Sequence, residues 1–273
     1  MPLPDATAPS SVDLAGRVIL VTGATGGIGR ALALACAGRG ATVVLHGRVV
    51  RKLESLYDEI VAAGHAEPTI LPLDFAKASP TDIDNVAGAL RAQLGRLDGL
   101  VHTAVFLGSL GPVEHQDPEA WRAAFEVNVT TPLALTRAAL PLLALAPDAS
   151  VVVTLDARGI DPRAFWGGYA ASKAALAALA ATLADEWETR ANMRINAVVP
   201  GPVRSPLRAR THPGEERSTL PPVESLVPLY LYLLAGQPKA ESGALIEARA
   251  WLDGHGAARP LVPSPASSTI GRP

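Results

Sequence analysis

The feature that most constrains the fold of this chain is a regular alternation of short β-branched runs and longer Ala- and Leu-rich segments. The longer segments have the length and the apolar spacing of helices. Strands separated by helices form right-handed βαβ units, which build a parallel sheet. We therefore predict an α/β fold with a doubly wound, seven-stranded parallel sheet and helices on both faces. The predicted strands are 17–22, 42–46, 69–73, 99–103, 150–154, 194–199 and 244–247.

The length of the chain, 273 residues, fits one large α/β domain better than two average ones. Residues 1–13 and 257–273 are rich in Pro, Ser and Ala without periodicity. We predict a flexible N-terminus, a single domain over 14–256 and a flexible C-terminal tail. Within that domain, residues 201–224 are rich in Pro and Arg and too long for an ordinary connection, so we predict a substrate loop there.

Charge and cysteine content narrow the class of function. The formal net charge of −2 argues against a dominant polyanion partner, so we expect no nucleic acid. The single cysteine, Cys36, excludes an intramolecular disulfide and a Cys-rich zinc site, and the histidines lack a metal-ligand spacing. No apolar run approaches the roughly 20 residues that span a bilayer, and the N-terminus lacks a signal-peptide pattern. We expect a cytoplasmic protein with no metal and no membrane partner.

A glycine-rich turn, GATGGIG at residues 23–29, follows the first predicted strand and precedes a helical segment. The first glycine permits a sharp turn, the second lets the backbone approach a pyrophosphate, and the third lets helix and strand pack closely. Amides at the helix N-terminus then face the phosphates. An ordinary tight turn is the alternative, but the position after the first strand favours a nucleotide site in a Rossmann-type fold.

The end of the second predicted strand bears on the choice of nucleotide. A dinucleotide fold that prefers NAD usually has an acid there, which accepts from the ribose 2′-hydroxyl. This chain has no acid there but His46, Gly47 and Arg48. Arg48, with Arg51 and Lys52 nearby, would pair with a 2′-phosphate, which predicts NADP(H) rather than NAD(H). The alternative is a solvated basic start of the next helix.

Tyr169 and Lys173 are four residues apart at the start of a strongly helical segment, so they share one helix face. A phenol has a reference pKa of about 10, and a neighbouring ammonium lowers that value. The pair would let Tyr169 give a proton to a carbonyl oxygen during hydride transfer, or take it back. A chance Tyr-x-x-x-Lys on a helix surface is the alternative. Trp166, three residues earlier, lines either the substrate pocket or the core.

Four motifs resemble, in order and spacing, the classical short-chain dehydrogenase/reductase family over roughly residues 14–250. They are TGATGGIG at 22–29, Asn128 in FEVNVTTP, YAASK at 169–173 and PGPVRS at 200–205. LHGR at 45–48 and LDGLVH at 97–102 are similar to a largely uncharacterised bacterial branch of NADP-type oxidoreductases. The resemblance implies an NADP(H)-dependent enzyme that interconverts a small-molecule carbonyl and alcohol and assembles as a homodimer or homotetramer.

The resemblance also implies roles for individual residues. Tyr169 is the general acid/base, Lys173 binds the nicotinamide ribose and tunes Tyr169, and Asn128 holds a water linked to the lysine. Asp74 matches the family acid that contacts adenine, and Pro132 suits a local distortion of the helix that carries Asn128. The implied cofactor-binding residues are Gly23, Thr25, Gly27, Ile28, Gly29, Arg48, Asp74, Phe75, Thr103, Ala104, Tyr169, Lys173, Pro200, Gly201 and Val203.

Two positions depart from the family pattern. Val105 stands where a glycine lets the cofactor ribose come close. Asp156 stands thirteen residues before Tyr169, where the family has a catalytic serine that donates to the substrate oxygen. An ionised Asp has no proton to donate, repels an incipient alkoxide and tends to raise the pKa of Tyr169.

Four interpretations of Asp156 are open. It is protonated in an apolar site, or neutralised by Arg158 or another base, or matched to a substrate that offers an amine or hydroxyl donor, or a sign of decayed catalysis. The first three keep Asp156 as an atypical member of the catalytic group. The last would make the chain a catalytically silent nucleotide-binding sensor or scaffold of the same fold.

Overall fold

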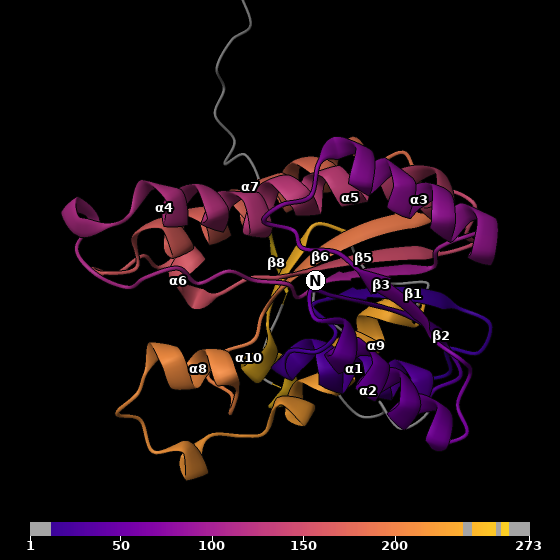
Figure 1. Cartoon of the computed structure of the whole chain (residues 1–273), viewed down its shortest axis with the longest axis horizontal. Helices are drawn as coiled ribbons and strands as arrows, with labels where there is room; N and C mark the ends of the chain where they lie inside the picture. The colour runs from indigo at the N-terminus through magenta and orange to yellow at the C-terminus, as the bar shows by residue number, and fades with distance from the viewer. Residues whose placement is uncertain (1–11, 237–241, 255–257, 262–273) are drawn as a thin grey trace, which may run out of the picture.

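The sheet is the centre of the fold (Figure 1). The computed structural model describes residues 12–236, 242–254 and 258–261. Seven parallel strands follow one another in the order β3-β2-β1-β4-β5-β6-β7. The order reverses between β1 and β4, and ligands of open α/β sheets bind at the carboxyl ends of strands at such a switch point. The strands are β1 (Val18–Thr22), β2 (Thr42–Gly47), β3 (Thr69–Pro72), β4 (Gly99–His102), β5 (Ala149–Thr154), β6 (Met193–Val199) and β7 (Ala244–Glu247).

The seven predicted parallel strands are confirmed, and the described residues add an eighth, antiparallel strand at the edge of the sheet. β8 (Arg259–Pro260) pairs antiparallel with β7, placing Ala244 opposite Pro260. Two residues carry no alternating pattern, and a proline without an N–H fits only the edge of a sheet. The predicted C-terminal tail thus contributes this strand. Its remaining residues, apart from 258 and 261, and residues 1–11 of the predicted flexible N-terminus lie outside the described residues.

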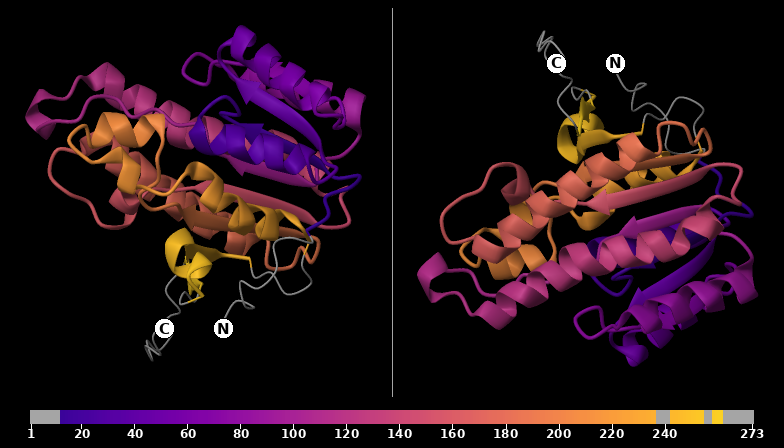
Figure 2. Two further views of the ribbon diagram at one scale, coloured as in Figure 1. Left: turned by 90° about the horizontal axis from the view of Figure 1, so that it is seen from below. Right: turned by 90° about the horizontal axis from the view of Figure 1, so that it is seen from above.

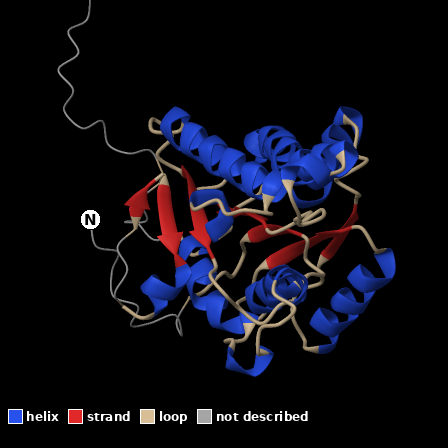
Figure 3. Ribbon diagram, turned by 90° about the vertical axis from the view of Figure 1, so that its left-hand side faces the viewer, coloured by secondary structure: helices blue, strands red, loops and turns tan. Residues whose placement is uncertain are grey.

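Helices cover both faces of the sheet, which confirms the doubly wound arrangement (Figures 1 and 3). Viewed from above, α5 lies between α3 and α7, and viewed from below, α1 lies beside α9 (Figure 2). Two apolar cores follow this division, one around Leu32 and Tyr230 and the other around Leu100 and Leu135. The first face carries α1 (Gly27–Ala37), α2 (Val50–Ala62), α9 (Val227–Leu234) and α10 (Ala248–Leu252), and the second α3 (Pro80–Leu94), α5 (Thr131–Leu143) and α7 (Gly167–Glu186).

The helix that carries Asn128 is locally distorted, as Pro132 predicts. α4 (Pro118–Phe125) continues into η3 (Glu126–Thr130), a turn of π-helix that leads into α5. Pro132 has no N–H to give to the carbonyl four residues earlier, which belongs to Asn128. The backbone therefore widens at this residue, and such π-turns are frequent at functional sites.

The predicted substrate loop over 201–224 is largely ordered into short helical turns. It contains α8 (Pro206–Thr211) and 3₁₀ turns at Arg217–Thr219 and Val223–Leu226. Ser205 caps α8 by accepting from the Arg208 N–H at 3.1 Å. The Arg208 guanidinium donates two 2.6 Å hydrogen bonds to Glu215, which closes the loop on itself. Together with α4 and α6 (Ala157–Ile160), α8 projects beyond the carboxyl ends of the strands (Figure 1).

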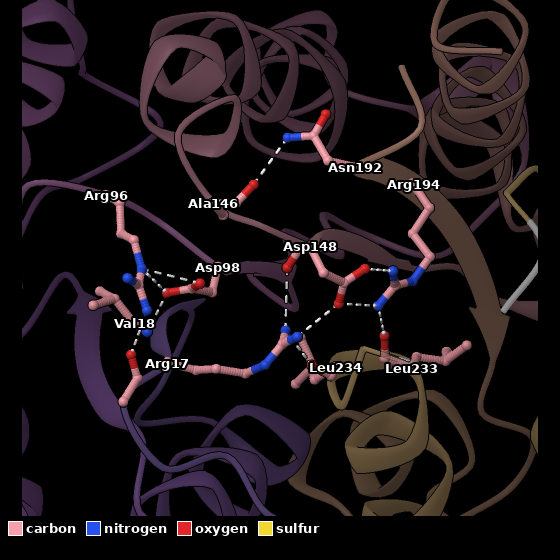
Figure 4. Close-up of polar contacts among 11 residues, drawn as sticks. Arg17, Val18, Arg96, Asp98, Ala146, Asp148, Asn192, Arg194, Leu233 and Leu234 are labelled. Atoms are coloured by element: carbon pink, nitrogen blue, oxygen red, sulfur yellow. Dashed lines mark hydrogen bonds and ion pairs between the residues drawn. The ribbon is translucent and has the colours of Figure 1, made fainter. Parts of the chain in front are cut away.

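Two carboxylates, at the amino end of the sheet, accept hydrogen bonds from residues near the beginning of neighbouring strands (Figure 4). Asp148, just before β5, accepts hydrogen bonds from Arg17 at 2.6 Å and from Arg194 of β6. Burial alone would raise the pKa of the Asp148 carboxyl, but the hydrogen bonds from Arg194 and Arg17 outweigh it and hold the pKa below its ordinary value. Asp98, just before β4, accepts from the Val18 N–H at 2.9 Å. These contacts stabilise the end of the sheet away from the ligand crevice.

Candidate active site

A cavity of about 550 Å³ opens at the carboxyl ends of the strands, at the switch point between β1 and β4. β2 and β5 lie on opposite sides of the β1–β4 pair, so Arg48 and Asp156, which follow them, mark opposite ends of the cavity. The predicted site residues that line it are Gly23, Gly27, Ile28, Gly29, Arg48, Thr103, Asp156, Tyr169, Lys173, Pro200, Gly201 and Val203.

The glycine turn packs against the chain segment after β4. Gly23 has φ = 68°, and a Cβ there would lie 2.9 Å from the Cα of Ala104. A Cβ on Gly29 would lie 2.6 Å from Thr103 Oγ1 and would overlap the Gly23 carbonyl. No side chain caps the amides that begin α1. These free amides and the absence of Cβ atoms fit the pyrophosphate of a dinucleotide.

Thr103 and Ala104 hold the turn in place. Their backbone N–H groups donate to Thr22 Oγ1 at 3.1 and 3.2 Å, and the Thr103 hydroxyl donates to the Thr22 carbonyl. Thr103 also lines the cavity, whereas Ala104 does not. Val105, the β-branched departure, lines the cavity as well, and the space beside it remains open.

His46 supports the glycine turn without lining the cavity, a role that the sequence argument missed. Its Nδ1 accepts the Gly23 N–H at 3.2 Å, so its proton is on Nε2, which donates to the Leu73 carbonyl at 3.0 Å. Its ring stacks on Phe75 with centroids 4.0 Å apart. Burial lowers the pKa of His46 to about 4, against the opposing effects of the Leu73 hydrogen bond and Asp74. A neutral His46 therefore joins the glycine turn to the end of β3.

This contact predicts acid sensitivity. The folded-state pKa of His46 lies below its unfolded value. As the pH is lowered, the unfolded chain therefore takes up the proton first, and the free energy of unfolding decreases. Between pH 7 and pH 5 we expect His46 to remove about 2 kcal/mol of unfolding free energy. His46→Gln keeps an acceptor and a donor but does not titrate. Urea unfolding at both pH values should show a loss about 2 kcal/mol smaller in this variant than in the wild type. Equal losses would contradict the assignment.

The adenine end of the predicted site is only partly in the cavity wall. Arg48 is exposed at its edge, and no ion pair of Arg48 occurs within the described ranges. Thr25, Asp74 and Phe75 are not among the lining residues. The Asp74 carboxylate accepts from the Ala76 N–H at 3.2 Å, just after β3. Contacts of these residues with adenine remain predictions.

Tyr169, Lys173 and Asp156 lie together at the other end. Tyr169 Oη donates to Asp156 Oδ2 at 3.0 Å, and Asp156 Oδ1 accepts the Arg158 N–H at 2.8 Å, which caps α6. Lys173 Nζ donates to the Thr154 carbonyl at 2.8 Å. Tyr169 and Lys173 are both buried in the first turns of α7. Asp156 is therefore a cavity residue in direct contact with the phenol.

This geometry corrects the predicted effect of Lys173 on Tyr169. Burial, and then the charge and hydrogen bond of Asp156, raise the pKa of Tyr169 well above its ordinary value. Burial lowers the pKa of Lys173 to about 8, with Asp156 opposing. The phenol donates directly to Asp156, whereas the Lys173 ammonium is directed at the Thr154 carbonyl.

Asn128 is buried and positions two backbone segments. Its Oδ1 accepts the Phe106 N–H at 2.8 Å, and its Nδ2 donates to the Phe106 carbonyl and to Ser172 Oγ, both at 2.9 Å. It thereby connects the chain after β4 to the helix of Tyr169 and Lys173. Asn128 does not itself line the cavity, and its water-holding role remains a prediction.

An aromatic wall borders Tyr169. Trp166 lines the cavity, which decides between its two interpretations in favour of the pocket. Its ring lies 5.8 Å, centroid to centroid, from Tyr169 and from His212. The Arg158 guanidinium lies over the same ring at 5.6 Å. His212, at the end of α8, was missed because nothing in a Pro- and Arg-rich segment predicts which side chain turns inward.

Other expectations concern residues away from the cavity. Cys36 is buried, as predicted from its apolar helix, and burial raises the pKa of its thiol to about 12. Over the described ranges, no three His, Cys, Asp or Glu side chains are grouped so that they could hold a metal ion. No helix in the same ranges is long and apolar enough to cross a membrane.

The doubly wound sheet and the glycine turn at its switch point are typical of the class of dinucleotide-binding α/β folds. The sequence model of the short chain dehydrogenase family matches residues 17–216, and the chain belongs to this family. It is 36% identical over 233 residues to the uncharacterized oxidoreductase YciK of Escherichia coli K12, covering 85% of this chain and 92% of that protein. The predicted resemblance to a largely uncharacterised bacterial branch is thus confirmed.

Solved structures show the same likeness. A short chain dehydrogenase of Escherichia coli CFT073 complexed with NADPH has 36% identity and a TM-score of 0.84, covering 87% of this chain and 98% of its own. One from Shigella flexneri 2a, complexed with NADP, has 35% identity and a TM-score of 0.84, covering 88% of this chain and 100% of its own.

Proposed function

We propose that this protein is an NADP(H)-dependent oxidoreductase that interconverts a carbonyl and an alcohol by hydride transfer. The observation that carries the proposal is the buried Tyr169–Lys173 pair in the wall of the cavity that the glycine turn also lines. NADP(H) in that cavity would supply or accept the hydride. The NADP and NADPH complexes of its structural relatives support this cofactor. We further propose a homodimer or homotetramer, as the family resemblance implies, and we propose that it works in the cytoplasm.

Each residue of the site has its own proposed role. The amides at the start of α1 would bind the pyrophosphate, and Arg48 the 2′-phosphate. Lys173 would bind the nicotinamide ribose, bordered by Pro200, Gly201 and Val203. Tyr169 would give its phenolic proton to the carbonyl oxygen in reduction and take one from the alcohol in oxidation. Asp156 competes for that proton, because the phenol donates to it in the structure.

The second candidate is a catalytically silent nucleotide-binding sensor or scaffold. The contact between Asp156 and Tyr169 favours it, since the phenol with its raised pKa is a poorer proton donor. The two candidates share cofactor binding and differ in turnover. A carbonyl that is reduced by the wild type but not by Tyr169→Phe supports the enzyme.

The cofactor half of the proposal is tested by titrating the protein with NADPH and, in parallel, NADH, followed by cofactor fluorescence. We expect NADPH to bind more tightly, and Arg48→Ala to weaken NADPH binding about tenfold, the worth of one charge-assisted contact. NADH binding should not change. Arg91→Ala is the matched control, because Arg91 is exposed on α3 and does not line the cavity. Equal effects on both cofactors would contradict the role of Arg48.

A further inference from the structure

Asp156 and Tyr169 together present hydrogen-bond acceptors to the substrate end of the cavity. The Tyr169 proton is already given to Asp156 Oδ2, and the carboxylate takes its second hydrogen bond from the Arg158 N–H. A carboxylate has about four lone-pair sites, so two remain open, and the phenol oxygen keeps its lone pairs. A bare carbonyl brings only another acceptor to this pair. The group that fits beside Asp156 is a hydrogen-bond donor.

The carboxylate of Asp156 favours a cation as that donor, because an opposite charge in direct contact strengthens the hydrogen bond. Asp156 is the one acidic side chain among the described residues that line the cavity. The basic residues nearest to it are turned elsewhere: Lys173 donates to the Thr154 carbonyl, and Arg158 pairs with Asp161 at 3.8 Å. Burial, and then Arg208, lower the pKa of His212, so it is neutral near pH 7. The basic residues of the cavity wall are Arg48, Arg158, Lys173, Arg208 and Arg210.

The spacing of the two oxygens and the adjoining walls restrict the substrate further. Asp156 Oδ2 and Tyr169 Oη are 3.0 Å apart, a separation that suits two heteroatoms carried by neighbouring carbons. Val105, Leu107 and Trp166 line the cavity and offer apolar surface to the rest of the molecule. A donor and the reacting oxygen on adjacent carbons, attached to an apolar body, would complete these contacts.

Building on the proposed function, we propose that the substrate is a vicinal amino alcohol or the matching amino ketone, whose ammonium group is bound by Asp156 while its oxygen meets Tyr169. The ammonium replaces the phenol as donor to Asp156 Oδ2, which frees the Tyr169 O–H for the substrate oxygen. It also offsets the carboxylate charge, one cause of the raised pKa of Tyr169. The carboxylate in place of the family serine then acts as a specificity residue.

The test compares three compounds with the same ring: 2-amino-1-phenylethanol, 1-phenylethane-1,2-diol and 1-phenylethanol. Binding to the protein saturated with NADP⁺ is measured by calorimetry, and oxidation by the appearance of NADPH. We expect the amino alcohol to bind at least about tenfold more tightly than either other compound, the worth of one charge-assisted hydrogen bond. Asp156→Asn should abolish this preference, and Asp156→Ser should reverse it in the oxidation rates. Asp84→Asn removes the same charge at an exposed position of α3 and should preserve the preference for the amino alcohol.

The outcomes separate this inference from the proposed function. Equal binding of all three compounds, no binding of the amino alcohol, or a preference that survives in Asp156→Asn overturns it. A diol that matches the amino alcohol overturns the choice of a cation. NADPH titration of each variant shows whether its site is folded. Failure of the wild type to bind NADPH, or turnover that survives in Tyr169→Phe, counts against the proposed function instead.

Discussion

Replacing Tyr169 with Phe is expected to lower the turnover of any carbonyl or alcohol substrate by about 10²- to 10⁴-fold, the usual contribution of a positioned general acid. The variant removes one oxygen atom from a side chain that is 3% exposed, so the ring keeps its packing. It also deprives Asp156 of the phenol proton while leaving the Arg158 N–H in place. NADPH binding should persist, because the glycine turn and Arg48 are unchanged. Initial rates and a fluorescence titration on the same preparation measure both effects.

Tyr57→Phe is the matched control, since it removes the phenolic hydroxyl that Tyr57 of α2 donates to Glu67, away from the cavity. Its turnover should equal that of the wild type. Equal rates in Tyr169→Phe and the wild type would show that the phenol does not carry the proton. If the wild type binds NADPH but reduces no carbonyl, the silent nucleotide-binding interpretation gains support.

The sheet could be predicted because its strands combine β-branched side chains with near-complete burial. β5 and β6 are buried along their whole length, and apolar residues make up most of both strands, although Ser150, Arg194 and Asn196 are buried among them. β8 could not be predicted, because two residues carry no alternating pattern and the pairing of Arg259 with Glu247 of β7 joins positions far apart in the sequence. The helical turns within 201–224 were hidden for a different reason. They depend on Ser205 as a cap and on the Arg208–Glu215 pair, which are side-chain contacts within a loop.

The site could be predicted where function depends on local spacing. The glycine turn and the Tyr169–Lys173 pair each belong to one strand–helix unit, so their spacing is visible in the chain. His46 acts across strands, joining Gly23 of one loop to Leu73 of another, and no local pattern reveals such a contact. For Asp156 the position and its effect on the pKa of Tyr169 were predicted, but the direct hydrogen bond was not. The structure shows that it takes the Tyr169 proton, and this contact led to the proposed ammonium-bearing substrate.

Asp148 offers the largest expected effect on stability. In Asp148→Ala the Arg194 side chain, 8% exposed, loses its carboxylate partner, and Arg17 loses a 2.6 Å ion pair. The carbonyls of Leu233 and Leu234 remain as acceptors, but they leave the two positive charges uncompensated. We expect the unfolding free energy to fall by about 3 kcal/mol, as when one partner of a largely buried pair is removed. Urea unfolding measures this loss.

The loss of unfolding free energy in Asp148→Ala should come from the buried arginine that is left without a carboxylate, rather than from the loss of the ion pair itself. Adding Arg194→Met should therefore restore part of the stability, because an apolar side chain of similar length needs no partner there. Asp253→Ala, which breaks the exposed pair with Arg249, should have little effect. NADPH affinity of the folded Asp148→Ala protein should match the wild type, since the network lies at the amino end of the strands and the cavity at the carboxyl end. A double variant less stable than Asp148→Ala would show that the pair, and not the unpaired arginine, stabilises the sheet.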